Sequence, residues 1–232
     1  MCILAAMSEL VYADSAVVVV QKRAGEAVQG RRQDQKSLLR FWRQVLDAPE
    51  LQPVHRIDQP VGGLVILARH TKAFNTVQRA LTQGAVHRQY VAVLSTAPHP
   101  PEGTLEDRIQ VEGGKNRSRV DPAGKRAVLH YRTVGHTDHH TVVEVTLDTG
   151  RHHQIRAQFG HRGWAVVGDT KYGARRPLKD RGIALLAFRV AFPHPEQPLT
   201  VSCQAQFPET SLWQAVATQV LPLAGEDEFP AR

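Results

Sequence analysis

A single carboxylate flanked by cationic side chains is the part of this sequence best suited to chemistry. Residues 55–63 read His-Arg-Ile-Asp-Gln-Pro-Val-Gly-Gly and lead straight into the apolar run 64–68. Pro60 fixes one backbone torsion, and the two glycines allow torsions or close approaches that larger residues resist. The pattern predicts a turn, held against a buried strand, that keeps Asp58 ionised and aims it at a substrate. The structural alternative is an Arg-Asp pair that only ties down a surface turn.

A second polar cluster follows later in the chain. Two arginines, two histidines and two glutamines fall within residues 151–158. If a helix starts after Gly150, its free backbone N–H groups, Arg151 and His152 form a cationic end. His152 and Arg156 are four residues apart and would share one face of that helix. This density favours a function over a solvated helix face.

Residues 113–126 form a basic segment, predicted to be a loop that grips phosphates, in which the carboxylate of Asp121 stands against five cations. The cations are Lys115, Arg117, Arg119, Lys125 and Arg126. The whole chain carries a formal net charge of +7. Because Lys and Arg gain affinity for phosphates by displacing counterions, we expect a polyanionic partner.

The composition excludes several other classes of protein. The chain has 232 residues, of which 42% are apolar and 22% charged, as in ordinary globular proteins. No apolar run approaches the roughly 20 residues that span a bilayer, so no membrane association is expected. Cys2 and Cys203 have no C-x-x-C spacing, which indicates neither a disulfide framework nor a thiolate metal cage and fits the cytoplasm.

The histidines at positions 136, 139 and 140, beside Asp138, raise the alternative of a metal site. They lie between two predicted strands, where adjacent histidines at a hairpin tip seldom converge on one ion. We therefore expect a solvated hairpin tip and no metal.

Hydrophobic periodicity predicts a strand-rich chain with interspersed helices. The predicted strands are 10–12, 17–20, 64–69, 88–95, 104–109, 126–134, 141–147, 183–192 and 199–207. The predicted helices are 37–46, 71 to a stop at Gly84, 150 to about 163, and 211–221. Without regular βαβ alternation, this order indicates an α+β fold with a mixed, largely antiparallel sheet flanked by helices. We expect an N-terminal extension (1–9), one catalytic domain (10–221) and a C-terminal tail (222–232).

Two of these helices have an expected buried face. Leu38, Phe41, Trp42 and Val45 share one side of the helix at 37–46. In the next helix, Thr71 is a candidate cap, and Phe74, Val77 and Leu81 form the expected buried stripe.

Four motifs, in order along residues 10–207, resemble those of the RluA-type pseudouridine synthases. These enzymes replace the N1–C1′ bond of uridine in RNA by a C5–C1′ bond. Residues 55–58 resemble the family's H-R-L-D motif, and residues 88–92 resemble the segment with the active-site tyrosine. Residues 149–156 match T-G-R-x-H-Q-I-R, and residues 168–173 match G-D-x-x-Y-G.

The resemblance implies roles for individual residues. Asp58 is the expected catalytic carboxylate, Tyr90 the active-site tyrosine, and Arg156 the arginine that pairs with the aspartate. A central cleft is expected to bind RNA. The expected RNA contacts are His55, Arg56, Lys115, Arg117, Arg119, Arg151, His153 and Gln154.

The chain departs from the family around these motifs. Where the family usually has D-x-x-T-S-G, this chain has Val61 and Gly62 in place of the threonine and the serine. Where the family has K-P-A-G, residues 22–25 read K-R-A-G, so the proline is missing. The usual L-H-A has Leu186 in place of its histidine. No S4-like RNA-binding segment precedes the motifs, so RNA recognition is expected from the catalytic domain's own loops or from a partner.

Together these features predict a monomeric cytoplasmic RNA pseudouridine synthase that acts on structured rRNA or tRNA without a cofactor or metal. Detaching the base and rejoining it through carbon needs one ionised carboxylate rather than redox chemistry. The alternative is a catalytically impaired RNA-binding protein that retains the synthase fold. A nucleoside hydrolase or glycosidase would normally need a second carboxylate or a metal, and no second acidic motif stands out.

Overall fold

The computed structural model describes residues 8–30 and 36–220, which fall into two compact units. The first unit holds the chain up to Arg88 together with residues 180–182 and 186–206. The second holds residues 89–179, 183–185 and the chain from Phe207 onward. The expected N-terminal extension and C-terminal tail lie largely outside the described residues, so the domain boundaries stay a prediction.

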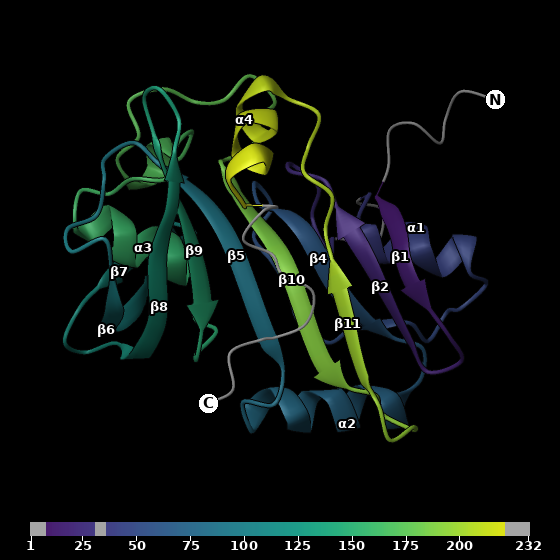
Figure 1. The fold of residues 1–232 in the computed structure, drawn as a ribbon. Coiled ribbons are helices and arrows are strands. Elements are labelled where there is room, and N and C mark those ends of the chain that lie inside the picture. The colour runs from purple at the N-terminus through teal and green to yellow at the C-terminus, as the bar shows by residue number, and fades with distance from the viewer. Residues whose placement is uncertain (1–7, 31–35, 221–232) are drawn as a thin grey trace. The chain divides into compact units, whose positions relative to one another are not determined.

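The first unit is built on a mixed sheet (Figure 1). Its main strands, in spatial order, are β1 (Glu9–Ala13), β2 (Val17–Lys22), β4 (Gly62–Ala68) and β10 (Leu185–Pro193). The short β3 (Gln52–Pro53) pairs with β4, and β11 (Thr200–Gln204) pairs with β10. Among the described strand pairs of this unit, the β4–β10 ladder is parallel and the others are antiparallel. Every residue of β4 is buried, as its continuous apolar run predicts.

Two helices belong to this unit. Helix α1 (Leu38–Val45) is capped by Ser37, whose side chain accepts a hydrogen bond from the Arg40 backbone N at 3.4 Å. Helix α2 (Thr71–Thr82) is capped not by Thr71 but by His70, whose Nδ1 accepts from the Ala73 backbone N at 3.3 Å.

The expected buried faces of these helices are partly wrong. Val45 at the end of α1 is 53% exposed. On α2, Ala73 and Val77 are buried, whereas Phe74 and Leu81 are only half-buried. Helix α2 packs on β3 and β4, and its buried residues are the small Ala73 and Val77 rather than the larger ones.

The second unit is an antiparallel sheet with helices against it (Figure 1). Its strands, in spatial order, are β5 (His87–Leu94), β9 (Thr141–Leu147), β8 (Lys125–His136), β6 (Glu102–Glu112) and β7 (Arg117–Val120). Helix α3 (Gln154–His161) packs on β6, β7 and the short 3₁₀ helix η2 (Thr170–Tyr172), and helix α4 (Ser211–Val220) packs on β8.

Two expectations for this unit are corrected. The basic segment 113–126 is not a continuous loop, because β7 lies inside it and pairs with β6. Helix α3 begins at Gln154 rather than just after Gly150, because His153 has φ +56° and this left-handed residue interrupts the helical path. His152 therefore precedes the helix and does not share a helical face with Arg156.

The α+β class and the mixed, largely antiparallel strand pairing are confirmed. The hairpin tip between β8 and β9, with its three histidines, is also confirmed. Within the part of the chain that the structure describes, no helix is long and apolar enough to cross a membrane.

Candidate functional site

Asp58 lies half-buried in the turn that precedes β4. The Val61 backbone N donates to the Asp58 carbonyl at 3.0 Å and closes the turn. Gly63 has φ +114°, and a Cβ added there would lie 2.3 Å from the carbonyl oxygen of Ala187 on β10. Only glycine fits this position, so the turn is held directly against the neighbouring strand.

The buried side chain of Lys22 is hydrogen-bonded to the same turn. The side chain is only 1% exposed, and its Nζ donates to the carbonyls of Arg23 at 2.9 Å, Glu26 at 2.8 Å and Gln59 at 3.1 Å. Burial lowers the pKa of Lys22 to about 8, against the opposing attraction of Glu26 and Asp58. Lys22 thus ties the residue after Asp58 to the end of β2. No sequence pattern predicts this role for Lys22, although residues 22–25 resemble the family's K-P-A-G segment.

His55 is half-buried, with its Nδ1 atom fully enclosed. Its Nε2 accepts from the Ile66 backbone N at 3.2 Å, and its buried Nδ1 has no hydrogen-bond partner among the described residues. Burial, followed by the nearby charge of Arg88, lowers the pKa of His55 to about 3. The imidazole is therefore neutral at physiological pH. Arg56, the next residue, is exposed. That His55 and Arg56 contact RNA stays a prediction.

Two departures from the family's motifs are neighbours in the structure. Gly62 on β4 and Leu186 on β10 are partners in the parallel ladder. A Cβ added to Gly62 would lie 3.5 Å from the Leu186 Cδ1, an ordinary van der Waals contact. Gly62, which replaces the family's serine, and Leu186, which replaces its histidine, therefore lie at the same contact beside the turn. Two polar side chains are absent there, and Leu186 adds an apolar one.

Arg156 is fixed by a buried ion pair in the second unit. Its Nε donates to Asp169 Oδ2 at 2.6 Å and its Nη2 donates to Oδ1 at 3.0 Å. Arg156 is 4% exposed and Asp169 1%. The guanidinium also lies 4.9 Å from the centre of the Tyr172 ring. This two-pronged pairing sets the plane of the guanidinium, and it gives Asp169 and Tyr172 of the G-D-x-x-Y-G motif a structural role that the sequence did not assign.

Tyr172 also joins the start of α3 to the basic hairpin, that is, to β6 and β7 with the connecting residues 113–116. Its hydroxyl accepts from the Ser118 backbone N at 2.8 Å and is hydrogen-bonded to His153 Nδ1 at 2.8 Å. Burial, then the charge of Arg156, lowers the pKa of His153 to about 2, so this imidazole is neutral. His152 stacks on His153 and lies 2.9 Å from Ser118 Oγ through its Nδ1. These hydrogen bonds therefore link strand β7 to the segment that precedes α3.

Gln154 and Arg151 have partners within this unit. The Gln154 Oε1 accepts from Thr149 Oγ1 at 2.8 Å and from the Arg151 backbone N at 3.0 Å. Its Nε2 donates to the Val128 carbonyl at 3.0 Å. The Arg151 Nε donates to a carbonyl of β8 at 2.8 Å, yet its side chain is exposed. Gln154 shapes the loop, and an RNA contact from either residue stays a prediction.

The basic hairpin presents its cations to solvent. Lys115, Arg117 and Arg119 are exposed. Arg119 pairs with Asp121 at 2.6 Å, and the Arg117 guanidinium lies 5.4 Å from the centre of the Tyr172 ring. The two arginines therefore have preferred positions on β7. Their contact with RNA stays a prediction.

Tyr90 is 7% exposed and lies on β5 opposite Val145 of β9. It belongs to the second unit with Arg156, whereas Asp58 belongs to the first. That the three side chains act together on one substrate stays a prediction. Within the described residues, no group of three His, Cys, Asp or Glu side chains is placed to hold a metal ion.

Known proteins are similar to this chain over the region that contains these motifs. The family described as RNA pseudouridylate synthase matches residues 16–161. An uncharacterized RNA pseudouridine synthase of Bacillus subtilis (strain 168) is 34% identical over 157 residues, 67% of this chain and 52% of that protein. Ribosomal large subunit pseudouridine synthase D of Pseudomonas aeruginosa is 30% identical over 224 residues, 88% of this chain and 70% of that protein.

The fold is that of a solved human structure, RNA Pseudouridylate Synthase Domain Containing 4, with a TM-score of 0.71 and 20% identity over 92% of this chain and 93% of that one. The chain spans about half to two thirds of the length of the first curated relatives it matches. The family match covers most of the chain, including the motifs that carry Asp58, Tyr90 and Arg156. The chain therefore belongs to the RNA pseudouridylate synthase family.

Proposed function

We propose that this protein isomerises uridine to pseudouridine in structured RNA. The observation that carries the proposal is that Asp58, Tyr90 and Arg156, each within its own motif, all fall inside the family match at residues 16–161. The reaction is an isomerisation, in which the N1–C1′ bond breaks, a C5–C1′ bond forms, and the proton on C5 is released while N1 gains one. It consumes no oxidant, reductant or nucleotide.

We assign one role to each of the three residues. Asp58 acts beside the ribose and base, either as a nucleophile or as a base that abstracts a proton. Arg156 favours the charged carboxylate and orients it, while Asp169 holds the plane of the guanidinium. Tyr90 stacks on the uracil and removes the C5 proton after the new bond forms.

Ribosomal RNA is the proposed substrate, because relatives that match most of this chain are named as ribosomal large subunit pseudouridine synthases. Transfer RNA is the second candidate. The target base must leave its helical stack to reach Asp58. The exposed cations Arg56, Lys115, Arg117, Arg119 and Arg151 are the proposed phosphate contacts. We expect the protein to work as a monomer in the cytoplasm.

The test is tritium release by the purified protein from RNA labelled at C5 of uridine, because formation of the C5–C1′ bond releases the hydrogen at that position. Unmodified rRNA and tRNA, isolated from cells lacking the gene, are supplied in separate reactions. Wild type is expected to release tritium from one of them, and Asp58→Asn to release none while binding RNA normally. Background release by both proteins, with intact RNA binding, would instead establish the alternative, an RNA-binding protein that has lost catalysis.

A further inference from the structure

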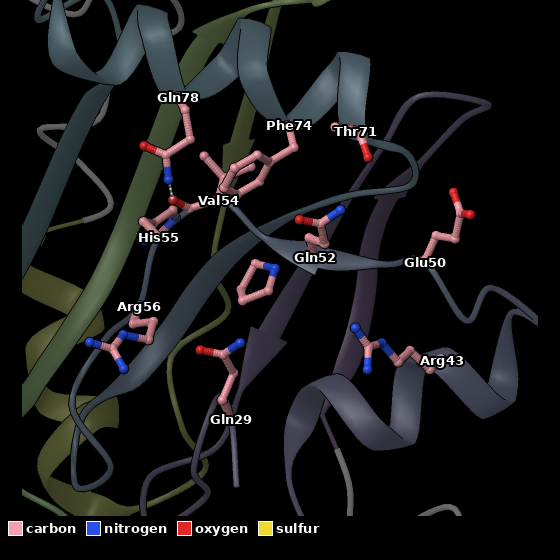
Figure 2. Close-up of a pocket in the computed structure, with 11 residues that line it drawn as sticks. Gln29, Arg43, Glu50, Gln52, Val54, His55, Arg56, Thr71, Phe74 and Gln78 are labelled. Atoms are coloured by element: carbon pink, nitrogen blue, oxygen red, sulfur yellow. Dashed lines mark hydrogen bonds between the residues drawn. The ribbon is translucent and has the colours of Figure 1, made fainter. Parts of the chain in front are cut away.

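A polar pocket of about 690 Å³ lies in the first unit, between α2, β3 and the segment that leads to Asp58 (Figure 2). Its volume lies in the range of sites that hold small organic molecules. It is lined by Gln29, Arg43, Glu50, Gln52, Pro53, Val54, His55, Arg56, Thr71, Phe74 and Gln78. Of its lining residues, only His55 and Arg56 have been given a role above, as expected RNA contacts.

Three carboxamides gather around the pocket, those of Gln29, Gln52 and Gln78 (Figure 2). The Gln78 Nε2 donates to the Val54 carbonyl, which fixes that side chain on the wall. Among the described residues, the side chains of Gln29 and Gln52 have no hydrogen-bond partner. A carboxamide carries both donors and an acceptor, as the edge of a nucleobase does, so these groups can pair with one.

Phe74 supplies an aromatic surface in the same pocket. On α2 it would be expected to pack against the sheet, but it is half-buried and its ring faces the pocket (Figure 2). Exposed aromatic rings beside polar groups are the usual platform on which proteins stack single-stranded bases.

The charges of the pocket fit a phosphodiester next to such a base. Arg43 and Arg56 line it against one carboxylate, that of Glu50. The Arg43 Nε donates to the Leu51 carbonyl at 3.0 Å, which holds the guanidinium in place. The side chain of Arg56 makes no ion pair within the described part of the protein. The net positive charge therefore favours an anionic ligand.

The position of the pocket relates it to the proposed reaction. Arg56 lines the pocket and lies two residues before Asp58, so their Cα atoms are at most about 7 Å apart. We propose that this pocket receives a second unstacked nucleotide of the RNA, close along the strand to the target uridine. The base stacks on Phe74 and pairs with the carboxamides, and Arg56 and Arg43 hold its phosphates. This proposal rests on the proposed function, since it assumes that RNA reaches Asp58.

The test uses the full chain and two probes, a fluorescein-labelled oligouridylate containing 4-thiouridine and free uridine monophosphate. Irradiated 4-thiouridine is expected to crosslink to the tryptic peptide 73–79, which contains Phe74. By anisotropy, Phe74→Leu should weaken oligouridylate binding by fivefold or more, and Phe74→Tyr should restore it. Phe41→Leu is the matched control, because Phe41 is also a half-buried helical aromatic but does not line the pocket.

Three results would overturn the proposal. One is crosslinking only to other peptides, and another is wild-type oligouridylate affinity for Phe74→Leu. The third is a loss of affinity for uridine monophosphate alone, which would make the pocket a free-nucleotide site. Tritium release by wild type is measured in parallel. Release without the crosslink refutes only the pocket, whereas the crosslink without release refutes only the synthase activity.

Discussion

Gly62 and Leu186 are ladder partners, and a Cβ at position 62 would lie 3.5 Å from the Leu186 Cδ1. The family's motifs place a serine and a histidine at these positions, which are 124 residues apart in the chain, by the difference 186 − 62. Both departures therefore meet at one contact in the sheet beside the Asp58 turn. A polar pair has been exchanged for an apolar one that needs no hydrogen bond.

This contact predicts non-additive effects on stability. Leu186→His alone buries an imidazole without a partner and should lower the free energy of unfolding by about 1–3 kcal/mol. Adding Gly62→Ser supplies a hydroxyl next to it and should recover part of that loss, with a coupling of about 0.5–3 kcal/mol in a double-mutant cycle measured by urea denaturation. Gly62→Ala with Leu186→His is the control without the hydroxyl. Strictly additive changes would show that the two positions do not interact.

Because the backbone at Gly63 lies so close to β10, replacing this glycine should lower the stability of the protein much more than backbone strain alone would. Gly63→Ala puts a methyl group 2.3 Å from a carbonyl oxygen of β10 and should cost more than about 4 kcal/mol or prevent folding. Gly25→Ala is the matched control, because Gly25 has φ +88° but no atom near its added Cβ, so it should cost only about 1–2 kcal/mol. Thermal unfolding of both variants makes the comparison, and equal losses would contradict the steric argument.

The buried pair of Arg156 and Asp169 predicts a loss of both stability and activity. Asp169→Asn removes one negative charge from a buried ion pair and should cost about 3–5 kcal/mol. At a temperature where the variant is folded, the rate of tritium release should fall while RNA affinity stays the same. Asp107→Asn is the control, since the ion pair that Asp107 forms with Arg162, the residue just after α3, is less buried. A variant with full activity would refute the orienting role of Asp169.

The neutral, half-buried His55 predicts sensitivity to acid. Its pKa is about 3 in the folded protein and about 6.5 in an unfolded chain, so below pH 6.5 the unfolded chain binds a proton that the folded one does not. Stability should fall as pH drops from about 6.5 toward 3, by up to about 1.4 kcal/mol per pH unit.

His55→Gln should flatten this dependence, because the glutamine oxygen can still accept from the Ile66 backbone N. Urea denaturation at a series of pH values between 4.5 and 7 measures the slope, with His139→Gln, an exposed histidine, as the control. An unchanged slope in His55→Gln would place the acid sensitivity elsewhere.

The sequence by itself determined the family, the α+β class and most strands, because these depend on local periodicity and on motifs that are contiguous in the chain. The apolar run after Asp58 became the fully buried β4, and Gly84 follows the end of α2 with φ +77° as expected. Such features need only the preferences of a few neighbouring residues.

Tertiary structure decided the features that depend on contacts between distant segments. The start of α3 moved to Gln154 because His153 adopts φ +56° while its ring bonds Tyr172, which lies 19 residues away. The supporting roles of Lys22 and Asp169 follow from burial and from partners that no local pattern names. The same is true of Gly62 and Leu186, because only the parallel pairing of β4 with β10 brings the two together.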